Sequence, residues 1–193
     1  MILVVGLGNP GPRYALTRHN AGFLVVDALS LRGGRVASFR PQFEGLYAET
    51  ELGGTRVGLL KPETFMNASG RSVRAAVAFF KLEPDALLVA HDELDVPFGE
   101  LRLKSGGGDG GHRGIRSISA ELATPGYGRL RVGIGRPPPD FQGDIADFVL
   151  QAVPPESRTE LASVLERASE VVESVVRDGL PQTMNRTNQR MLR

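Results

Sequence analysis

The chain alternates short runs of apolar, often β-branched residues with longer stretches whose apolar residues recur at helical spacing. The short runs predict β-strands at residues 2–6, 45–52, 55–61, 86–91, 100–104 and 130–135. The helical spacing predicts α-helices at about residues 20–31, 67–80, 111–122 and 156–177. The segment ELGG at residues 51–54 is typical of a hairpin turn, so part of the sheet should be antiparallel. The pattern as a whole predicts an α/β fold with a twisted mixed β-sheet flanked by helices.

The length of 193 residues suits one sizeable domain, and the chain has neither an internal repeat nor a convincing linker. We therefore expect a single domain over residues 1–193. From about residue 181 the chain carries Arg186, Arg190 and Arg193 without any acid, which predicts a basic and loosely ordered tail.

Composition excludes several classes of protein. The absence of cysteine rules out disulfides, thiolate nucleophiles and cysteine-bound zinc, and it fits a reducing compartment. No signal sequence opens the chain, and no apolar run approaches membrane-spanning length. We expect a cytoplasmic protein with no membrane partner. The net charge of +1 does not by itself indicate nucleic-acid binding, so the local distribution of charge must decide that question.

The first strand leads into GLGNPG at residues 6–11, which matches the spacing of a dinucleotide-binding fingerprint. That motif needs a helix opening inside the glycines and an acid at the end of a second strand. Here Pro10 and Pro12 interrupt the segment, and the acid at the right distance, Asp27, falls within a predicted helix. The pattern therefore argues against a nucleotide cofactor.

Polar side chains suited to chemistry gather in loops after predicted strands, where open α/β sheets usually place their sites. Asn9 and Asn67 offer amide groups that match a peptide group, whereas Asn20 is better explained as a helix cap. His19, His91 and His112 are each candidate general bases.

An activated histidine also needs an orienting group, commonly a carboxylate. Asp92, Glu93 and Asp95 follow His91 directly, and the sequence does not choose among them. Metal binding by these acids stays open, although the cysteine pair of a zinc deaminase is absent.

The segment SGGGDGG at residues 105–111 predicts either a mobile lid or backbone N–H groups exposed to a ligand. Arg102 and Lys104 should share one face of a strand, and Arg129 and Arg131 repeat that spacing on another strand. Aligned on one sheet, the two pairs would form a basic strip able to bind phosphates. The alternative is a set of ordinary solvated cations on an edge strand.

Four ordered segments together resemble bacterial peptidyl-tRNA hydrolases. They are GLGNPGPRYALTRHNAG (6–22), KPETFMNASG (61–70), HDELDVPFGELRLKSGGGDGGHRG (91–114) and RLRVGIGRP (129–137). The resemblance implies hydrolysis of the ester between a peptide and the 3′ end of tRNA, by a monomer that needs no cofactor, metal or protein partner. It implies that His19 activates water and that Asp92 orients His19. It implies substrate binding by Asn9, Tyr14, Met66, Asn67 and His112, and a grip on the tRNA 5′ phosphate by Lys104 and Arg131.

The chain departs from the family at one position. The family usually reads Gly-His-Asn-Gly where this chain has GHRG at residues 111–114. Arg113 is larger and cationic and has no hydrogen-bond acceptor, so we expect activity to be retained without assigning Arg113 a catalytic role. The alternative is a non-catalytic RNA-binding relative of the same fold. The joint presence of His19, Asp92, Asn9 and Asn67 argues against it, because binding RNA alone does not need that set.

Overall fold

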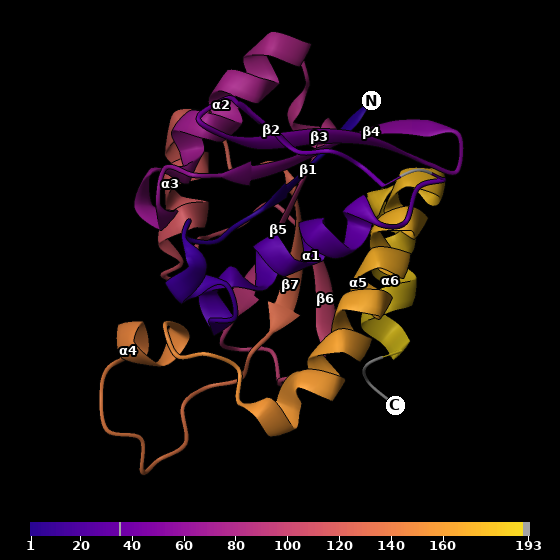
Figure 1. The fold of residues 1–193 in the computed structure, drawn as a ribbon. Coiled ribbons are helices and arrows are strands. Elements are labelled where there is room, and N and C mark those ends of the chain that lie inside the picture. Colours follow the sequence, from indigo (N-terminus) through magenta and orange to yellow (C-terminus); the bar gives the residue numbers. More distant parts are fainter. Residues whose placement is uncertain (35, 191–193) are drawn as a thin grey trace.

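Seven β-strands form one mixed sheet at the centre of the molecule, with helices on both faces (Figure 1). The computed structural model describes residues 1–34 and 36–190. Across the sheet the strands are β2 (Arg40–Gln42), β3 (Gly45–Leu52), β4 (Thr55–Pro62), β1 (Ile2–Gly6), β5 (Leu87–Glu93), β7 (Gly128–Gly133) and β6 (Leu101–Ser105). The helices are α1 (Ala21–Ser30), α2 (Ser69–Phe80), α3 (Arg113–Glu121), α4 (Ile145–Val149), α5 (Arg158–Asp178) and α6 (Leu180–Arg190).

The strands β4, β1, β5 and β7 run parallel in the middle of the sheet. The strands β3 and β4 form the antiparallel hairpin predicted at residues 51–54, and β2 and β6 also pair antiparallel with their neighbours. In β1, Val4 belongs to the core beneath α1 and α5, whereas Leu3 and Val5 belong to the core beneath α2 and α3. This burial on both faces explains the continuous apolar runs of the central strands. The predicted mixed α/β sheet is confirmed.

The parallel strands bring several loops to one edge of the sheet, because their carboxyl ends all lie there. The loop after β1 holds residues 7–20, the loop after β4 leads through the 3₁₀ helix Met66–Ala68, and Asp92 lies near the end of β5. The start of α3 is close by, since a Cβ added at Gly114 would lie 2.6 Å from the Met66 sulfur. These loops carry most of the candidate residues.

The C-terminal segment differs from the prediction. Residues 180–190 form the helix α6 instead of a loosely ordered tail, and Arg193 lies outside the described residues. The side chain of Asn188 accepts a hydrogen bond from Leu103 N (3.0 Å) and donates one to Leu103 O (2.9 Å), so it pairs with the exposed edge of β6. Covering an edge strand in this way satisfies backbone groups that would otherwise be open to another chain.

The other differences are small. The short elements β2 and α4 are not among the predicted elements, and β7 begins and ends two residues earlier than predicted. None of the helices in the described part of the chain combines the length and apolar character needed to cross a membrane.

Candidate active site

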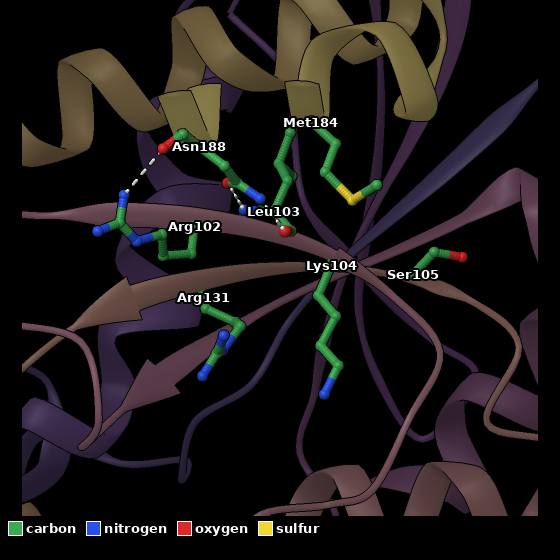
Figure 2. A pocket seen from close by; sticks show the side chains of 7 residues that line it. All are labelled: Arg102, Leu103, Lys104, Ser105, Arg131, Met184 and Asn188. Atoms are coloured by element: carbon green, nitrogen blue, oxygen red, sulfur yellow. Dashed lines mark hydrogen bonds between the residues drawn. The ribbon is translucent and has the colours of Figure 1, made fainter. Parts of the chain in front are cut away.

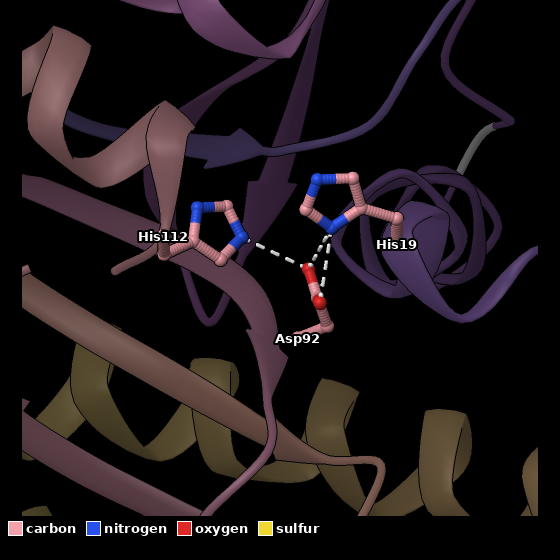
Figure 3. Close-up of side chains that lie close together, drawn as sticks. All are labelled: His19, Asp92 and His112. Atoms are coloured by element: carbon pink, nitrogen blue, oxygen red, sulfur yellow. Dashed lines mark hydrogen bonds and ion pairs between the residues drawn. The ribbon is translucent and has the colours of Figure 1, made fainter. Parts of the chain in front are cut away.

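One buried carboxylate, Asp92, binds two histidines from distant parts of the chain (Figure 3). Its Oδ1 and Oδ2 lie 2.9 and 3.0 Å from His19 Nδ1, and Oδ1 also lies 2.9 Å from His112 Nε2. Asp92 belongs to β5, His19 to the 3₁₀ helix Arg18–Asn20, and His112 is the N-cap of α3. The other two acids of this segment have different partners, since Glu93 binds Arg131 and Asp95 binds Arg136. Asp92 is therefore the carboxylate next to His19.

The hydrogen bonds fix the tautomers of both histidines. His112 Nδ1 accepts from the backbone N–H of Gly114 at 3.1 Å, so its proton is on Nε2 and is donated to Asp92. His19 donates its Nδ1 proton to the same carboxylate, which leaves the lone pair on Nε2. A histidine held in this state can accept a proton from a water molecule at Nε2.

The charge of Asp92 is maintained by these same neighbours. Asp92 is only 3% exposed, and this burial alone would raise the pKa of its carboxyl. The hydrogen bonds from His112 and His19, and the positive charge that each ring carries when it is protonated, outweigh burial and hold the pKa of Asp92 well below its usual range. The carboxylate therefore stays ionised and can stabilise a positive charge on His19.

His91 lies next to the cluster and is not suited to act as the general base. Its Nδ1 donates to the backbone carbonyl of Asp92 at 2.7 Å, and its ring meets that of His112 edge-on, with ring centres 4.9 Å apart. Complete burial, followed by the positive charge that His112 carries when it is protonated, lowers the pKa of His91 to about 3. The ring is neutral at physiological pH and serves a structural role, one of the two possibilities that the sequence left open.

Asn9 and Asn20 are hydrogen-bonded to each other in the loop that follows β1. Asn20 accepts from Asn9 N at 2.8 Å and donates to Asn9 O at 2.9 Å. Asn20 occupies the N-cap position of α1, as expected, but its side chain is bound to Asn9 and makes no cap hydrogen bond to the helix. Asn9 Oδ1 accepts from Met66 N at 3.0 Å. Among the described residues the Nδ2 group of Asn9 has no partner, so it remains free for a ligand.

The remaining predicted binding residues lie along the same edge. Met66 is buried beside Gly114, and Asn67 is exposed on the same 3₁₀ helix. Tyr14 is half-buried, with the Arg13 guanidinium 4.7 Å from its ring centre. Phe65 lies beside them and is not among the predicted residues. It is 53% exposed, and its φ of +59° is strained for a residue with a side chain. No sequence pattern marks that backbone conformation.

The cations of β6 and β7 do share one face of the sheet, as predicted. Lys104 lies opposite Arg129, and Arg102 lies opposite Arg131. Figure 2 shows Lys104 and Arg131 pointing to the same side of the sheet, at a cavity of about 530 Å³ that Met184 and Asn188 of α6 also line.

The four cations nevertheless differ in their surroundings. Arg131 Nε donates to Glu93 at 2.9 Å, whereas Lys104 has no acidic partner within the described part of the chain. Arg129 is buried and binds two backbone carbonyls, so the solvent-accessible basic strip consists of three half-buried cations and not four. Arg113, at the first position of α3, is exposed.

The same cluster contains the atoms of a potential metal site. His19, Asp92 and His112 each offer one ligand atom, and these atoms lie within 4.8 Å of one another. Ligand atoms on a tetrahedral zinc ion with bonds of about 2.0–2.1 Å are roughly 3.3 Å apart. The nitrogen–oxygen distances of 2.9 Å fit hydrogen bonds better than they fit two ligands of one metal ion. The geometry thus favours acid–base chemistry at His19.

Comparisons with known proteins agree with this arrangement. The profile of the family Peptidyl-tRNA hydrolase matches residues 3–193. A peptidyl-tRNA hydrolase of Frankia casuarinae is 54% identical over 185 residues, 95% of this chain and 92% of the relative. One from Sorangium cellulosum is 50% identical over 190 residues, 98% of this chain and 85% of the relative.

Solved structures show the same relationship. The crystal structure of peptidyl-tRNA hydrolase from Acinetobacter baumannii has a TM-score of 0.88 and 40% identity to this chain, covering 97% of this chain and 94% of that one. The match to the family profile, residues 3–193, contains every candidate residue described above. The chain therefore belongs to the peptidyl-tRNA hydrolase family.

Proposed function

We propose that this protein hydrolyses the ester that joins a peptide, or an N-blocked amino acid, to the 3′ end of tRNA, and so returns free tRNA to translation. Family membership supports the reaction class. The single observation that carries the assignment of roles is the His19–Asp92 pair, in which Nδ1 is bound to a carboxylate and Nε2 keeps its lone pair.

The chemistry is general base catalysis by His19. A water molecule gives one proton to His19 Nε2 while its oxygen forms a bond to the ester carbonyl carbon. Asp92 stabilises the imidazolium that results. The tetrahedral intermediate then breaks its bond to the ribose 3′ oxygen, and the imidazolium returns the proton to that oxygen. The protein is regenerated, and the products are a free carboxyl group and a free 3′ hydroxyl.

The side chains around His19 bind the reacting end of the substrate. We assign the free Nδ2 amide of Asn9 to a carbonyl oxygen of the peptidyl group, together with the exposed amide of Asn67. We assign Tyr14 and Met66 to the same substrate-binding surface. Both nitrogens of His112 are already used within the protein, so His112 contacts substrate only through ring carbons and mainly positions Asp92.

The cations of the sheet bind the 5′ end of the tRNA, next to the reacting 3′ end. Lys104, which has no acidic partner among the described residues, and Arg131 are assigned to the tRNA 5′ phosphate. One chain supplies both the residues around His19 and the phosphate-binding cations. We therefore propose that the protein acts as a monomer in the cytoplasm. The peptide contacts are mostly to backbone groups, so we expect weak preference for the peptide sequence.

The direct test uses an N-blocked aminoacyl-tRNA and follows release of free tRNA. We expect cleavage by the wild type without added metal, and loss of nearly all of the rate in His19→Ala with tRNA binding retained. Turnover by His19→Ala at the wild-type rate would contradict the assigned base. Tight tRNA binding without cleavage by the wild type would instead support the non-catalytic RNA-binding relative.

A further inference from the structure

The glycine-rich segment at residues 105–111 takes no part in the chemistry above, yet a buried arginine ties it to the interior. Arg129 is 3% exposed, and its guanidinium donates from Nη1 to Gly108 O at 2.7 Å and from Nη2 to Gly107 O at 2.8 Å. Its Nε is buried without a partner among the described residues. Burying a cation costs free energy. A buried arginine that is retained with one donor unsatisfied calls for a functional explanation.

Arg129 determines where the neighbouring N–H groups point. A trans peptide places its C=O and N–H on opposite sides, and the described chain contains no cis peptide. Because the carbonyls of Gly107 and Gly108 point inward to Arg129, the N–H groups of Gly108 and Asp109 point away from it. Neither N–H has an acceptor within the described residues. Two adjacent outward donors form the kind of backbone site that binds anions.

Lys104 lies beside Gly107, the residue that precedes these donors. It is opposite Arg129 in the β6–β7 ladder, and a Cβ added at Gly107 would lie 2.7 Å from Lys104 Nζ. Gly107 also has a φ of +91°, so both its conformation and the nearby ammonium group require glycine. The Asp109 carboxylate does not oppose an anion strongly, since it is bound to Arg116 Nε at 3.0 Å and to Gly111 N at 2.7 Å.

We propose that the N–H groups of Gly108 and Asp109 complete the phosphate site of Lys104, and that Arg129 is the positioning residue that aims them. The ligand is a terminal phosphate of RNA. Lys104 supplies a point charge without direction, whereas fixed N–H donors select the tetrahedral oxygens of a phosphate. Arg131 contributes less than its charge suggests, because Glu93 holds its Nε. This inference rests on the proposed function, since the phosphate is the tRNA 5′ phosphate assigned above.

The test compares two N-blocked aminoacyl-tRNA substrates that differ only in the presence of the 5′ phosphate. The readout is the ratio of their kcat/KM values on one enzyme preparation, which does not depend on the folded fraction. We expect the wild type to prefer the phosphorylated substrate. Arg129→Met should reduce that ratio about tenfold through a higher KM for the phosphorylated substrate, with kcat unchanged. Arg129→Lys should do nearly the same, because lysine keeps the charge but is shorter and lacks the rigid planar guanidinium that fixes the directions of two carbonyls.

The matched control is Arg167→Met. Arg167 also donates to a loop carbonyl, Gly99 O at 2.6 Å, but in a different loop, so this variant should keep the wild-type ratio. A wild-type ratio in Arg129→Lys would overturn the inference, because charge alone would then suffice. A wild type that cleaves both substrates equally well would also overturn it and would leave the hydrolase assignment intact. Failure of the wild type to cleave either substrate would reject the proposed function, and the same ratio measured by RNA binding would still decide the role of Arg129.

Discussion

Charge has different roles in two regions of the molecule, the His19–Asp92–His112 cluster and the cations Lys104 and Arg131. In the cluster, one buried carboxylate binds two histidines at 2.9–3.0 Å, and each ring is held in one tautomer. At the cations, Lys104 has no acidic partner among the described residues and faces an open cavity near the edge of the sheet. The first arrangement fixes the position of protons, and the second attracts a charged ligand.

This difference predicts different sensitivities for the two regions. Buried charges are screened little by salt but respond strongly to changes of protonation. Exposed cations that bind RNA phosphates lose affinity as salt rises, because binding releases counterions. Substitutions in the cluster should therefore change kcat and pH dependence. Substitutions at the cations should change KM and salt dependence.

The largest effect is expected for Asp92→Asn. An asparagine in this position can present its amide N–H to His19 Nδ1, so the ring would carry its proton on Nε2 and could not accept one from water. We expect the single-turnover rate to fall by roughly 10⁴-fold, the size of the same change in a Ser-His-Asp triad. The rate should be measured at saturating enzyme, with tRNA binding and urea unfolding as controls. A fall of less than tenfold would show that Asp92 does not set the tautomer of His19.

The second prediction concerns acid stability and depends on His91. The folded pKa of about 3 lies below the ordinary value of 6.5, so between these values the unfolded chain binds the proton and the folded chain does not. The stability that His91 contributes is therefore present above pH 6.5 and is lost as pH falls toward 3. At pH 4.5 the loss is on the order of 2–3 kcal/mol, from about 1.4 kcal/mol per pH unit.

The variant His91→Asn tests this linkage, because its amide can still donate to the Asp92 carbonyl but does not titrate. Urea unfolding at pH 7 and pH 4.5 should show a smaller loss of unfolding free energy in the variant than in the wild type. Asp92 does not interfere, because its pKa is lowered, so its contribution is lost only below about 3.8, its ordinary value. Equal losses in both proteins would mean that His91 accepts a proton in the folded state.

The third prediction concerns Lys104→Ala. We expect kcat/KM on full-length tRNA to fall about tenfold at low salt, while cleavage of a short 3′-end mimic stays nearly unchanged. The plot of log kcat/KM against log salt should become shallower by roughly 0.7–0.9, the contribution of one phosphate contact. The control is Arg74→Ala, which removes an exposed cation of α2 that is paired with Glu121. Equal losses on both substrates would show that Lys104 acts on the reacting end.

Regular periodicity explains which parts of the fold the sequence predicts. The strands β1 and β3 match their predicted bounds because alternation or continuous apolar character marks them from end to end. The helix α6 was missed because its sequence is mostly polar and it is stabilised by contacts to the β6 edge, such as the Asn188–Leu103 pair. Local composition does not contain that information.

The candidate site follows a similar division. The sequence identified His19, His112 and the three acids as chemically able groups, but the choice of Asp92 depends on which strand positions meet in space. The sequence places Asn20 correctly at the N-cap of α1 but does not show that its side chain binds Asn9 instead of the helix. Arg129 was grouped with the exposed cations, since alternation on a strand shows the shared face but not the burial beneath a loop.

The smallest effect is expected for Asn188→Ala, which separates α6 from the edge of β6. The change removes two hydrogen bonds to Leu103, each worth about 0.5–1.5 kcal/mol, and water can replace part of that loss because the edge is only partly buried. Lys104 is the next residue along the strand, so a looser edge should raise KM for tRNA about two- to threefold, with the 3′-end mimic unaffected. Steady-state kinetics on both substrates measures this. A larger loss on the mimic than on tRNA would mean that α6 supports the His19–Asp92 cluster, and the two regions would then be energetically coupled.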